Sequence, residues 1–209
     1  MASKVFAQFR NVLQIENGDW KENCYLVSSS TNRCIIIDPG SGADFIEDQI
    51  QKRNYQPVAI FCTHAHFDHV GAVAELADRF RVKTFLHEAD LQTLKQANIY
   101  LAAMGISKPI VIPDIDIFPA GGDVYEFVDI KVQVIHTPGH TAGSCAFFIN
   151  GKLFTGDTIF KNSFGKPDRI SGNSQLLEES IDTLQRLHVG NVVFAGHGEP
   201  FILANREWS

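Results

Sequence analysis

The sequence predicts an α/β fold in which two mixed β-sheets pack face to face and helices cover their outer faces, giving four layers in the order αββα. Three observations lead to this prediction. The expected elements form a strand meander, then alternating strands and helices, then a second meander and a final helix and strand, so the two halves share one plan. Hydrophobic residues make up 44% of the chain, which is enough for a sizeable core. No low-complexity linker separates the halves, so we expect one domain over residues 1–209.

The N-terminal half is expected to begin with strands and to continue with alternating helices and strands. Short runs of β-branched and aromatic residues between turn formers predict strands. Apolar residues at helical spacing predict helices. The expected strands are 5–10, 24–28, 34–38, 58–62 and 83–86. The expected helices are 44–53, 70–80 and 88–104.

Residues 105–122 interrupt this pattern with three prolines and repeated Ile-Asp pairs. They predict a long surface connection, which is often functional in a compact domain. The C-terminal half then resumes with the expected strands 124–127, 131–136, 145–149, 153–156 and 192–195 and an amphipathic helix at 175–187.

Charge and hydropathy argue against several classes of protein. The formal net charge of −6 disfavours a nucleic-acid partner, which requires clustered Lys and Arg. No apolar stretch approaches the roughly 18 residues of a membrane span, and the N-terminus lacks a signal-peptide core. The four cysteines form no CxxC pair, so we expect reduced thiols and a cytoplasmic location.

The segment THAHFDH at residues 63–69 carries four candidate metal ligands within six residues: His64, His66, Asp68 and His69. If the backbone stays extended after the strand, His64 and His66 point the same way and can share one ion. Asp68 and His69 follow where a helix begins, so they point to a second position. Imidazole nitrogen and carboxylate oxygen are ligands for Zn²⁺, Fe²⁺ or Mn²⁺.

Three more candidate metal ligands share one local sequence pattern. His140 in TPGHT, Asp157 in TGDT and His197 in AGHGE each follow an apolar strand and lie beside glycine. Glycine lets the backbone approach closely and adopt positive φ, so that the ligand can be directed inward. Taken alone, each is equally well explained as a turn residue. Together, these strand ends indicate one functional rim.

At this point the chain resembles the metallo-β-lactamase superfamily. THAHFDH is similar to the THxHxDH signature of that family, and His140, Asp157 and His197 match its later ligand positions in order. Within the superfamily the closest resemblance is to the short bacterial form of the hydroxyacylglutathione hydrolase (glyoxalase II) group, carried by residues 156–184.

The resemblance implies a binuclear centre. It assigns His64, His66 and His140 to one ion and Asp68, His69 and His197 to the other, with Asp157 bridging both. Two divalent ions are expected, with Zn as the first choice and Fe or Mn as alternatives. Two cations lower the pKa of a shared water towards neutrality, which supplies a nucleophile at pH 7. Asp68 is also a candidate proton relay.

The resemblance implies hydrolysis of a small-molecule acyl thioester such as S-D-lactoylglutathione. Longer members of the group add a C-terminal helical region that binds glutathione. The sequence ends 12 residues after His197, so we expect that region to be missing. Two alternatives stay open. A persulfide dioxygenase would hold a single iron with His64, His140 and Asp157, and a lactone or other ester hydrolase would use the same nucleophile.

Residues around these ligands have candidate supporting roles. Ligand histidines need their second N–H fixed, and Asp38 and Thr141 are candidates for that role, although Asp38 is equally well explained as an ordinary turn residue. Thr63 either forms a hydrogen bond at the strand end or is an ordinary β-branched strand residue. The candidate substrate-binding residues follow Asp157 in the sequence and are Phe160, Lys161, Phe164, Lys166 and Arg169.

Overall fold

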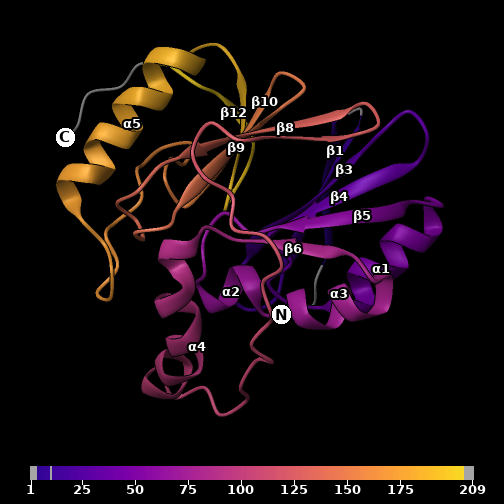
Figure 1. Ribbon diagram of the computed structural model, residues 1–209, viewed down its shortest axis with the longest axis horizontal. Helices are drawn as coiled ribbons and strands as arrows, with labels where there is room; N and C mark the ends of the chain where they lie inside the picture. The colour runs from indigo at the N-terminus through magenta and orange to yellow at the C-terminus, as the bar shows by residue number, and fades with distance from the viewer. Residues whose placement is uncertain (1–3, 10, 205–209) are drawn as a thin grey trace.

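The computed structural model describes residues 4–9 and 11–204, and two six-stranded sheets packed face to face form its centre (Figure 1). The first sheet has the order β1-β2-β3-β4-β5-β6. Its strands are β1 (Lys4–Phe9), β2 (Val12–Asn17), β3 (Glu22–Ser28), β4 (Arg33–Ile37), β5 (Gln56–Phe61) and β6 (Lys83–Phe85). The pairs are antiparallel from β1 to β4 and parallel from β4 to β6, so the sheet is mixed.

The second sheet has the order β12-β11-β10-β9-β8-β7. Its strands are β7 (Val124–Phe127), β8 (Ile130–His136), β9 (Cys145–Ile149), β10 (Lys152–Gly156), β11 (Val192–Ala195) and β12 (Phe201–Ile202). Only the β10–β11 pair is parallel among these, so this sheet is mixed as well.

Helices cover the outer faces of both sheets (Figure 1). The helices of the N-terminal half are α1 (Ala43–Lys52), α2 (Phe67–Val70), α3 (Val73–Phe80) and α4 (Leu91–Ala103), with a 3₁₀ turn at Glu88–Asp90. The C-terminal half contributes α5 (Ser174–His188). Ile46 and Leu76 pack these helices on the first sheet, and Leu177 and Ile181 pack α5 on the second. The predicted fold class is therefore confirmed.

A separate apolar layer holds the two sheets together. Tyr25, Ile37 and Phe61 of the first sheet pack against Phe147 and Phe154 of the second, and all five are almost completely buried. The alternation of side chains along each strand sends every second residue into this layer. The remaining apolar residues of the same strands face the helices, so burial of both faces accounts for the continuous apolar runs in the sequence.

Two strands were missing from the sequence prediction. β2 was overlooked because Gln14 and Asn17 interrupt its apolar pattern, yet both side chains are fully buried. The Gln14 amide donates to Asn23 and to the Gly198 carbonyl, which places a polar group inside the fold. β12 has only two residues, too few for a pattern to indicate a strand. Arg10, the last residue of the first expected strand, lies outside the described residues.

The connection at residues 105–122 lacks helices and extended strands, as expected, but part of it is packed on the core. Ile110 and Ile112 contact the cluster beneath α3 and α4. Asn98 on α4 holds Ile110 with two hydrogen bonds of 3.0 and 2.9 Å. Among the described residues, none of the helices has the length and apolar character needed to cross a membrane.

Candidate metal centre

The candidate ligands gather where strands of both sheets end. THAHFDH follows β5, while Asp157 follows β10 and His197 follows β11. Backbone hydrogen bonds join these ends across the two sheets: the Cys145 amide donates to Thr63 and the Asn23 amide to Gly196. The seven predicted ligands therefore share the rim where strands of both sheets end. The first and the last of them are more than 130 positions apart in the sequence.

Three imidazoles form the first ligand group: His64, His66 and His140. Nδ1 of His66 lies 3.0 Å from Nε2 of His64 and 3.0 Å from Nε2 of His140. Three nitrogen atoms that converge at this spacing match the ligands of a single divalent cation. The side chains of His66 and His140 are 20% and 11% exposed, so the group lies at the base of an opening.

The other ring nitrogen of each of these histidines faces an acceptor. His64 Nδ1 lies 3.0 Å from Thr63 Oγ1, His66 Nε2 lies 3.0 Å from Asp168 Oδ2, and His140 Nδ1 lies 2.6 Å from the Lys166 carbonyl. With a proton on each of these outward nitrogens, the lone pairs of the inward nitrogens all face the centre. This is the arrangement that fixes the tautomer of a ligand histidine.

The second ligand group combines Asp68, His69 and His197. Asp68 Oδ2 lies 3.8 Å from His69 Nε2 and 3.6 Å from His197 Nε2. Outward hydrogen bonds again orient the rings, because His69 Nδ1 is 3.1 Å from Asp38 Oδ2 and His197 Nδ1 is 3.3 Å from the Lys21 carbonyl.

Asp157 lies between the two groups. Its Oδ1 is 3.5 Å from His69 Nε2, and its Oδ2 is 3.6 Å from His197 Nε2 and 3.8 Å from His140 Nε2. His69 Nε2 and Asp157 Oδ1 are buried and have no hydrogen-bond partner. Buried polar atoms without a partner are costly, and a cation between them would remove that cost. The residues present therefore fit two divalent cations.

Electrostatics distinguish the two groups. Burial and the neighbouring rings lower the pKa of His64 well below its usual value, and burial also lowers the pKa of His140. Burial acts the same way on His69, but the carboxylates of Asp157 and Asp68 outweigh it and raise the pKa of His69. Burial thus disfavours positive charge on His64 and His140 in the first group, whereas the carboxylates of Asp68 and Asp157 favour positive charge at the second group, which suits a cation.

Asp38 connects the ligand segment to the end of β4. Its carboxylate accepts from the Thr63 amide at 2.7 Å, from Thr63 Oγ1 at 2.6 Å and from His69 Nδ1 at 3.1 Å. The sequence left its role open between a turn residue and a partner of a ligand. The structure shows both, because Asp38 also has a positive φ of 50° at the turn. Thr63 links Asp38 to His64, so of its two expected roles the hydrogen-bonding one is correct.

Thr141 does not contact a ligand imidazole, and this corrects the expected role. Its hydroxyl donates to Asp90 Oδ2 at 2.9 Å and lies 2.7 Å from Ser144 Oγ. Asp90, which the sequence analysis missed, is fully buried and accepts from the amides of Ala65 at 2.8 Å and Gly143 at 2.7 Å. It joins the loop that carries His64 and His66 to the loop that carries His140.

Asp168 was also missed, although it lies between Lys166 and Arg169, two of the residues considered as substrate contacts. Its Oδ1 accepts from the amides of Ile170, Ser171 and Gly172, and its Oδ2 faces His66. Burial favours the neutral acid, but these hydrogen bonds lower the pKa of Asp168 to about 2. The sequence signal was an Asp followed by a turn, which is common in loops and gave no indication of the partner.

Gly196 is required where β11 enters the site. A Cβ on this residue would lie 2.0 Å from Asp157 Oδ1 and 2.8 Å from His69 Cε1. No side chain fits there, so the glycine beside His197 permits the close approach that the sequence predicted.

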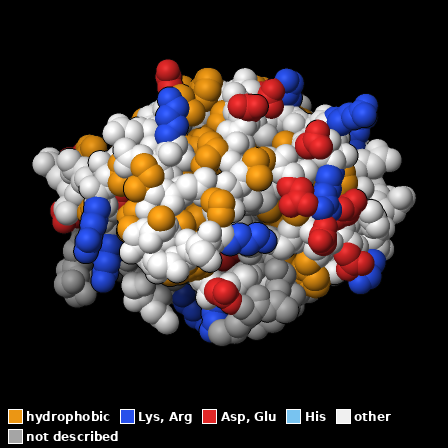
Figure 2. Space-filling view, turned by 90° about the horizontal axis from the view of Figure 1, so that it is seen from below, with side chains coloured by type: hydrophobic (Ala, Val, Ile, Leu, Met, Phe, Trp, Pro, Cys, Tyr) orange, Lys and Arg blue, Asp and Glu red, His pale blue; other side chains and the backbone are white. Residues whose placement is uncertain are grey.

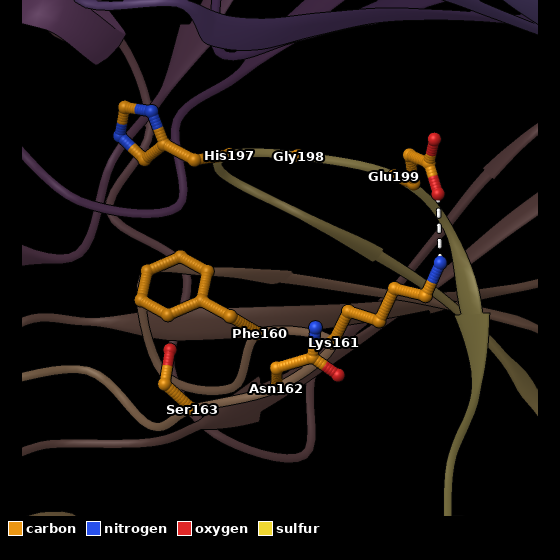
Figure 3. Close-up of a pocket in the computed structure, with 7 residues that line it drawn as sticks. All are labelled: Phe160, Lys161, Asn162, Ser163, His197, Gly198 and Glu199. Atoms are coloured by element: carbon orange, nitrogen blue, oxygen red, sulfur yellow. Dashed lines mark hydrogen bonds and ion pairs between the residues drawn. The ribbon is translucent and has the colours of Figure 1, made fainter.

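A cavity of about 600 Å³ opens beside His197 (Figure 3). Phe160 and Lys161 line it, and the ring of Phe160 lies 6.1 Å from that of His197. Lys161 Nζ pairs with Glu199 Oε2 at 2.7 Å across this cavity. The other candidates lie elsewhere: Phe164 packs against the core beneath α5, and the side chains of Lys166 and Arg169 are exposed and do not line the cavity.

A family model matches most of the chain. The model of the metallo-beta-lactamase superfamily matches residues 17–197, which include all seven candidate ligands. The chain belongs to this superfamily. The resemblance found in the sequence is confirmed at that level.

Relatives within the superfamily cover most of the chain. The probable metallo-hydrolase YqgX of Bacillus subtilis is 29% identical over 87% of both chains. The hydroxyacylglutathione hydrolase GloC of Haemophilus influenzae is 29% identical over 86% of both. The crystal structure of TTHA1623 in a di-iron-bound form is similar with a TM-score of 0.82 and 32% identity, over 91% of this chain and 94% of that one. The chain is thus similar to metal-dependent hydrolases and to a protein whose site holds two irons.

Proposed function

We propose that this superfamily member is a binuclear metallohydrolase that cleaves small-molecule acyl thioesters, with acyl thioesters of glutathione as candidate substrates. The observation that carries the proposal is Asp157, whose two carboxylate oxygens face His69 on one side and His140 and His197 on the other. His69 Nε2 and Asp157 Oδ1 are buried without hydrogen-bond partners, and a second ion between them would satisfy both. The likeness to GloC supports a thioester as the substrate.

The metal ligands and Asp68 have different roles in the proposed reaction. Bound divalent cations would lower the pKa of a shared water and polarise the thioester carbonyl. Hydrolysis of a thioester forms a C–O bond to water and breaks the C–S bond, so a proton from the water must reach the departing thiolate. Asp68 is 13% exposed and lies 3.6 Å from His197 Nε2, a position from which it would accept the proton and release it to the sulfur.

The cavity beside His197 would hold the thiol part of the substrate. Phe160 offers an apolar wall and Lys161 offers a cation, although Glu199 already compensates that charge. We therefore infer that Lys161 binds a substrate carboxylate more weakly than a cluster of unpaired basic residues would.

Purification without added metal, followed by elemental analysis and a thiol-release assay on S-D-lactoylglutathione, tests the proposal. We expect two divalent ions per chain and release of glutathione. One iron per chain with oxygen uptake on glutathione persulfide would instead identify a dioxygenase. Two ions with cleavage of an acyl-homoserine lactone and no thiol release would identify a lactone hydrolase, and either result would overturn the thioester assignment.

A further inference from the structure

A second cavity, of about 340 Å³, lies against the metal centre on the side of the N-terminal half. It is formed by the β2–β3 turn, the segment after β4, the ligand segment, α4 and the connection that follows α4. Asp68 is among its lining residues, so it opens directly onto the second ligand group. Its volume is at the lower end of the range of small-molecule sites.

The walls of this cavity are predominantly apolar. Phe67 and Leu101 are 9% and 4% exposed and form its inner side. Ile106 and Ile110 are half-buried and complete the wall from the connection. Seen from below, the molecule shows hydrophobic side chains between charged ones (Figure 2).

Trp20 lies at the outer side of the cavity. Its ring meets the ring of Phe67 edge to face, with centroids 5.3 Å apart and an interplanar angle of 79°. The residue is nevertheless 43% exposed, although a tryptophan of a folded chain normally buries most of its surface. An apolar ligand in the cavity would cover Trp20 and gain contact with a rigid aromatic surface.

Polar side chains form a smaller part of the lining and belong to Asp19, Glu22, Ser41, Asp68 and Lys108. At the metal end, Ser41 Oγ donates to Glu22 Oε1 at 2.9 Å, so these two side chains satisfy each other. At the opening, Lys108 is exposed to solvent. The larger, apolar part of the lining favours a hydrocarbon group over a hydroxylated one.

We propose that this second cavity binds the acyl group of the substrate and selects apolar acyl chains of several carbons over acetyl or lactoyl groups. The proposal rests on the proposed thioester hydrolysis, and it adds the class of acyl group. With the scissile carbonyl at the metal centre, the thiol part extends into the cavity beside His197 and the acyl chain extends past Asp68 towards Trp20. Each part of the thioester thus has a separate site.

A chain-length series tests this selection. The substrates are the glutathione thioesters of acetate, butyrate, hexanoate and D-lactate, each assayed by thiol release. Burial of one methylene contributes about 0.8 kcal/mol, which corresponds to about fourfold in kcat/KM. We expect kcat/KM to rise by about two- to fourfold for each methylene as far as hexanoyl, and the lactoyl thioester to resemble the acetyl one. Equal values along the series would overturn the proposal.

Three variants locate the effect. Trp20→Ala should lower the ratio of hexanoyl to acetyl kcat/KM by about tenfold, because the aromatic wall is removed. Ile106→Trp should lower the same ratio by filling the cavity. Phe118→Ala is the matched control, since Phe118 is 45% exposed and is not a lining residue of this cavity. If the control changes the ratio as much as Trp20→Ala does, the cavity is not the determinant.

A binding experiment separates this proposal from the thioesterase proposal. The sequence contains two tryptophans, so Trp208→Phe leaves Trp20 as the single fluorescent indole. Titration with hexanoate should change its emission at concentrations at least tenfold lower than titration with acetate. A change with hexanoate in a protein that cleaves no thioester would refute the thioesterase and retain the cavity as an acyl site. Thiol release without any preference for hexanoate in the titration would retain the thioesterase and refute the acyl site.

Discussion

The two ligand groups of the centre are built from different chemistry. The first holds the three imidazoles of His64, His66 and His140, and burial lowers the pKa of His64 and of His140. The second combines two imidazoles with Asp68 and faces the carboxylate of Asp157, which raises the pKa of His69. The first group therefore selects an ion by nitrogen ligation, whereas the second attracts an ion by charge.

The surroundings of the two groups differ in the same sense. Each imidazole of the first group is oriented from outside by a different partner: a threonine hydroxyl, a carboxylate and a backbone carbonyl. In the second group, Asp38 orients His69 and reaches the first group through Thr63. The two sites would therefore differ in metal preference. Imidazole ligands suit Zn and Fe, whereas carboxylate-rich sites also accept harder ions such as Mn.

The largest expected effect comes from the residue that the two groups share. Asp157→Ala removes the only carboxylate that faces both of them among the described residues. We expect loss of at least one ion and a decrease in thioester hydrolysis beyond the ~10–100-fold caused by changes to outer partners. Elemental analysis and thiol release measure both effects, with Asp182→Ala on the exposed side of α5 as the control. Two ions retained in Asp157→Ala would show that this residue does not bridge.

Gly196→Ala should damage the second group selectively. The added Cβ would lie 2.0 Å from Asp157 Oδ1 and 2.8 Å from His69 Cε1, so one of these side chains must move. A displacement of about 1 Å costs on the order of 100-fold in rate. Gly190→Ala is the control, because its added Cβ meets open space and the positive φ of 85° at Gly190 is not shared by Gly196, so any loss of activity in the control reports backbone strain alone. Equal activity in the two variants would contradict the close approach.

Asp168→Asn and Asp38→Asn should separate the groups by metal affinity. An Asn at position 168 cannot accept from His66 and from the backbone amides at the same time, so the first ion should bind about 10–100-fold more weakly. Asp38→Asn should weaken both ions, because Asp38 reaches His69 directly and His64 through Thr63. Stepwise titration of the metal-free proteins with Zn²⁺ by calorimetry distinguishes these patterns. Weakening of the same single ion in both variants would refute the assignment.

Lys161→Ala gives an effect of intermediate size on substrate binding. Its charge is paired with Glu199 and 48% exposed, so the loss should raise KM for S-D-lactoylglutathione by roughly two- to fivefold and leave kcat unchanged. Lys52→Ala is matched to it, since Lys52 is also exposed and pairs with Asp48 at 2.6 Å, but lies on α1. A rise in KM of the same size in both variants would remove Lys161 from the substrate site.

Asp90→Asn should affect stability more than chemistry. An Asn at this position has one accepting oxygen for three donors, which are the amides of Ala65 and Gly143 and the hydroxyl of Thr141. A buried donor left without a partner costs about 1–3 kcal/mol, so the free energy of unfolding should fall by about that amount while the metal content stays at two ions. Urea unfolding measures it, and Asp182→Asn is the control. Unchanged stability would show that Asp90 does not join the two ligand loops.

Local patterns made the fold and the ligands predictable. THAHFDH directly follows an apolar strand, and each later ligand lies beside a glycine at another strand end. Because strand ends of packed sheets meet at one rim, the sequence alone predicts that these residues lie together. The polar strand β2 was missed because burial of Gln14 depends on partners in another part of the chain.

The sequence by itself determined which side chains are available for metal binding, since that depends on residue type and on the turn each residue occupies. The tertiary structure alone decided what orients them and what surrounds them. His66 meets Asp168 across 102 positions, Ala65 meets Asp90 across 25, and His140 meets the Lys166 carbonyl across 26. The cavity of Trp20 likewise joins segments from residue 18 to residue 110. Contacts between such distant positions follow from how the sheets and helices pack, which no local pattern of residues contains.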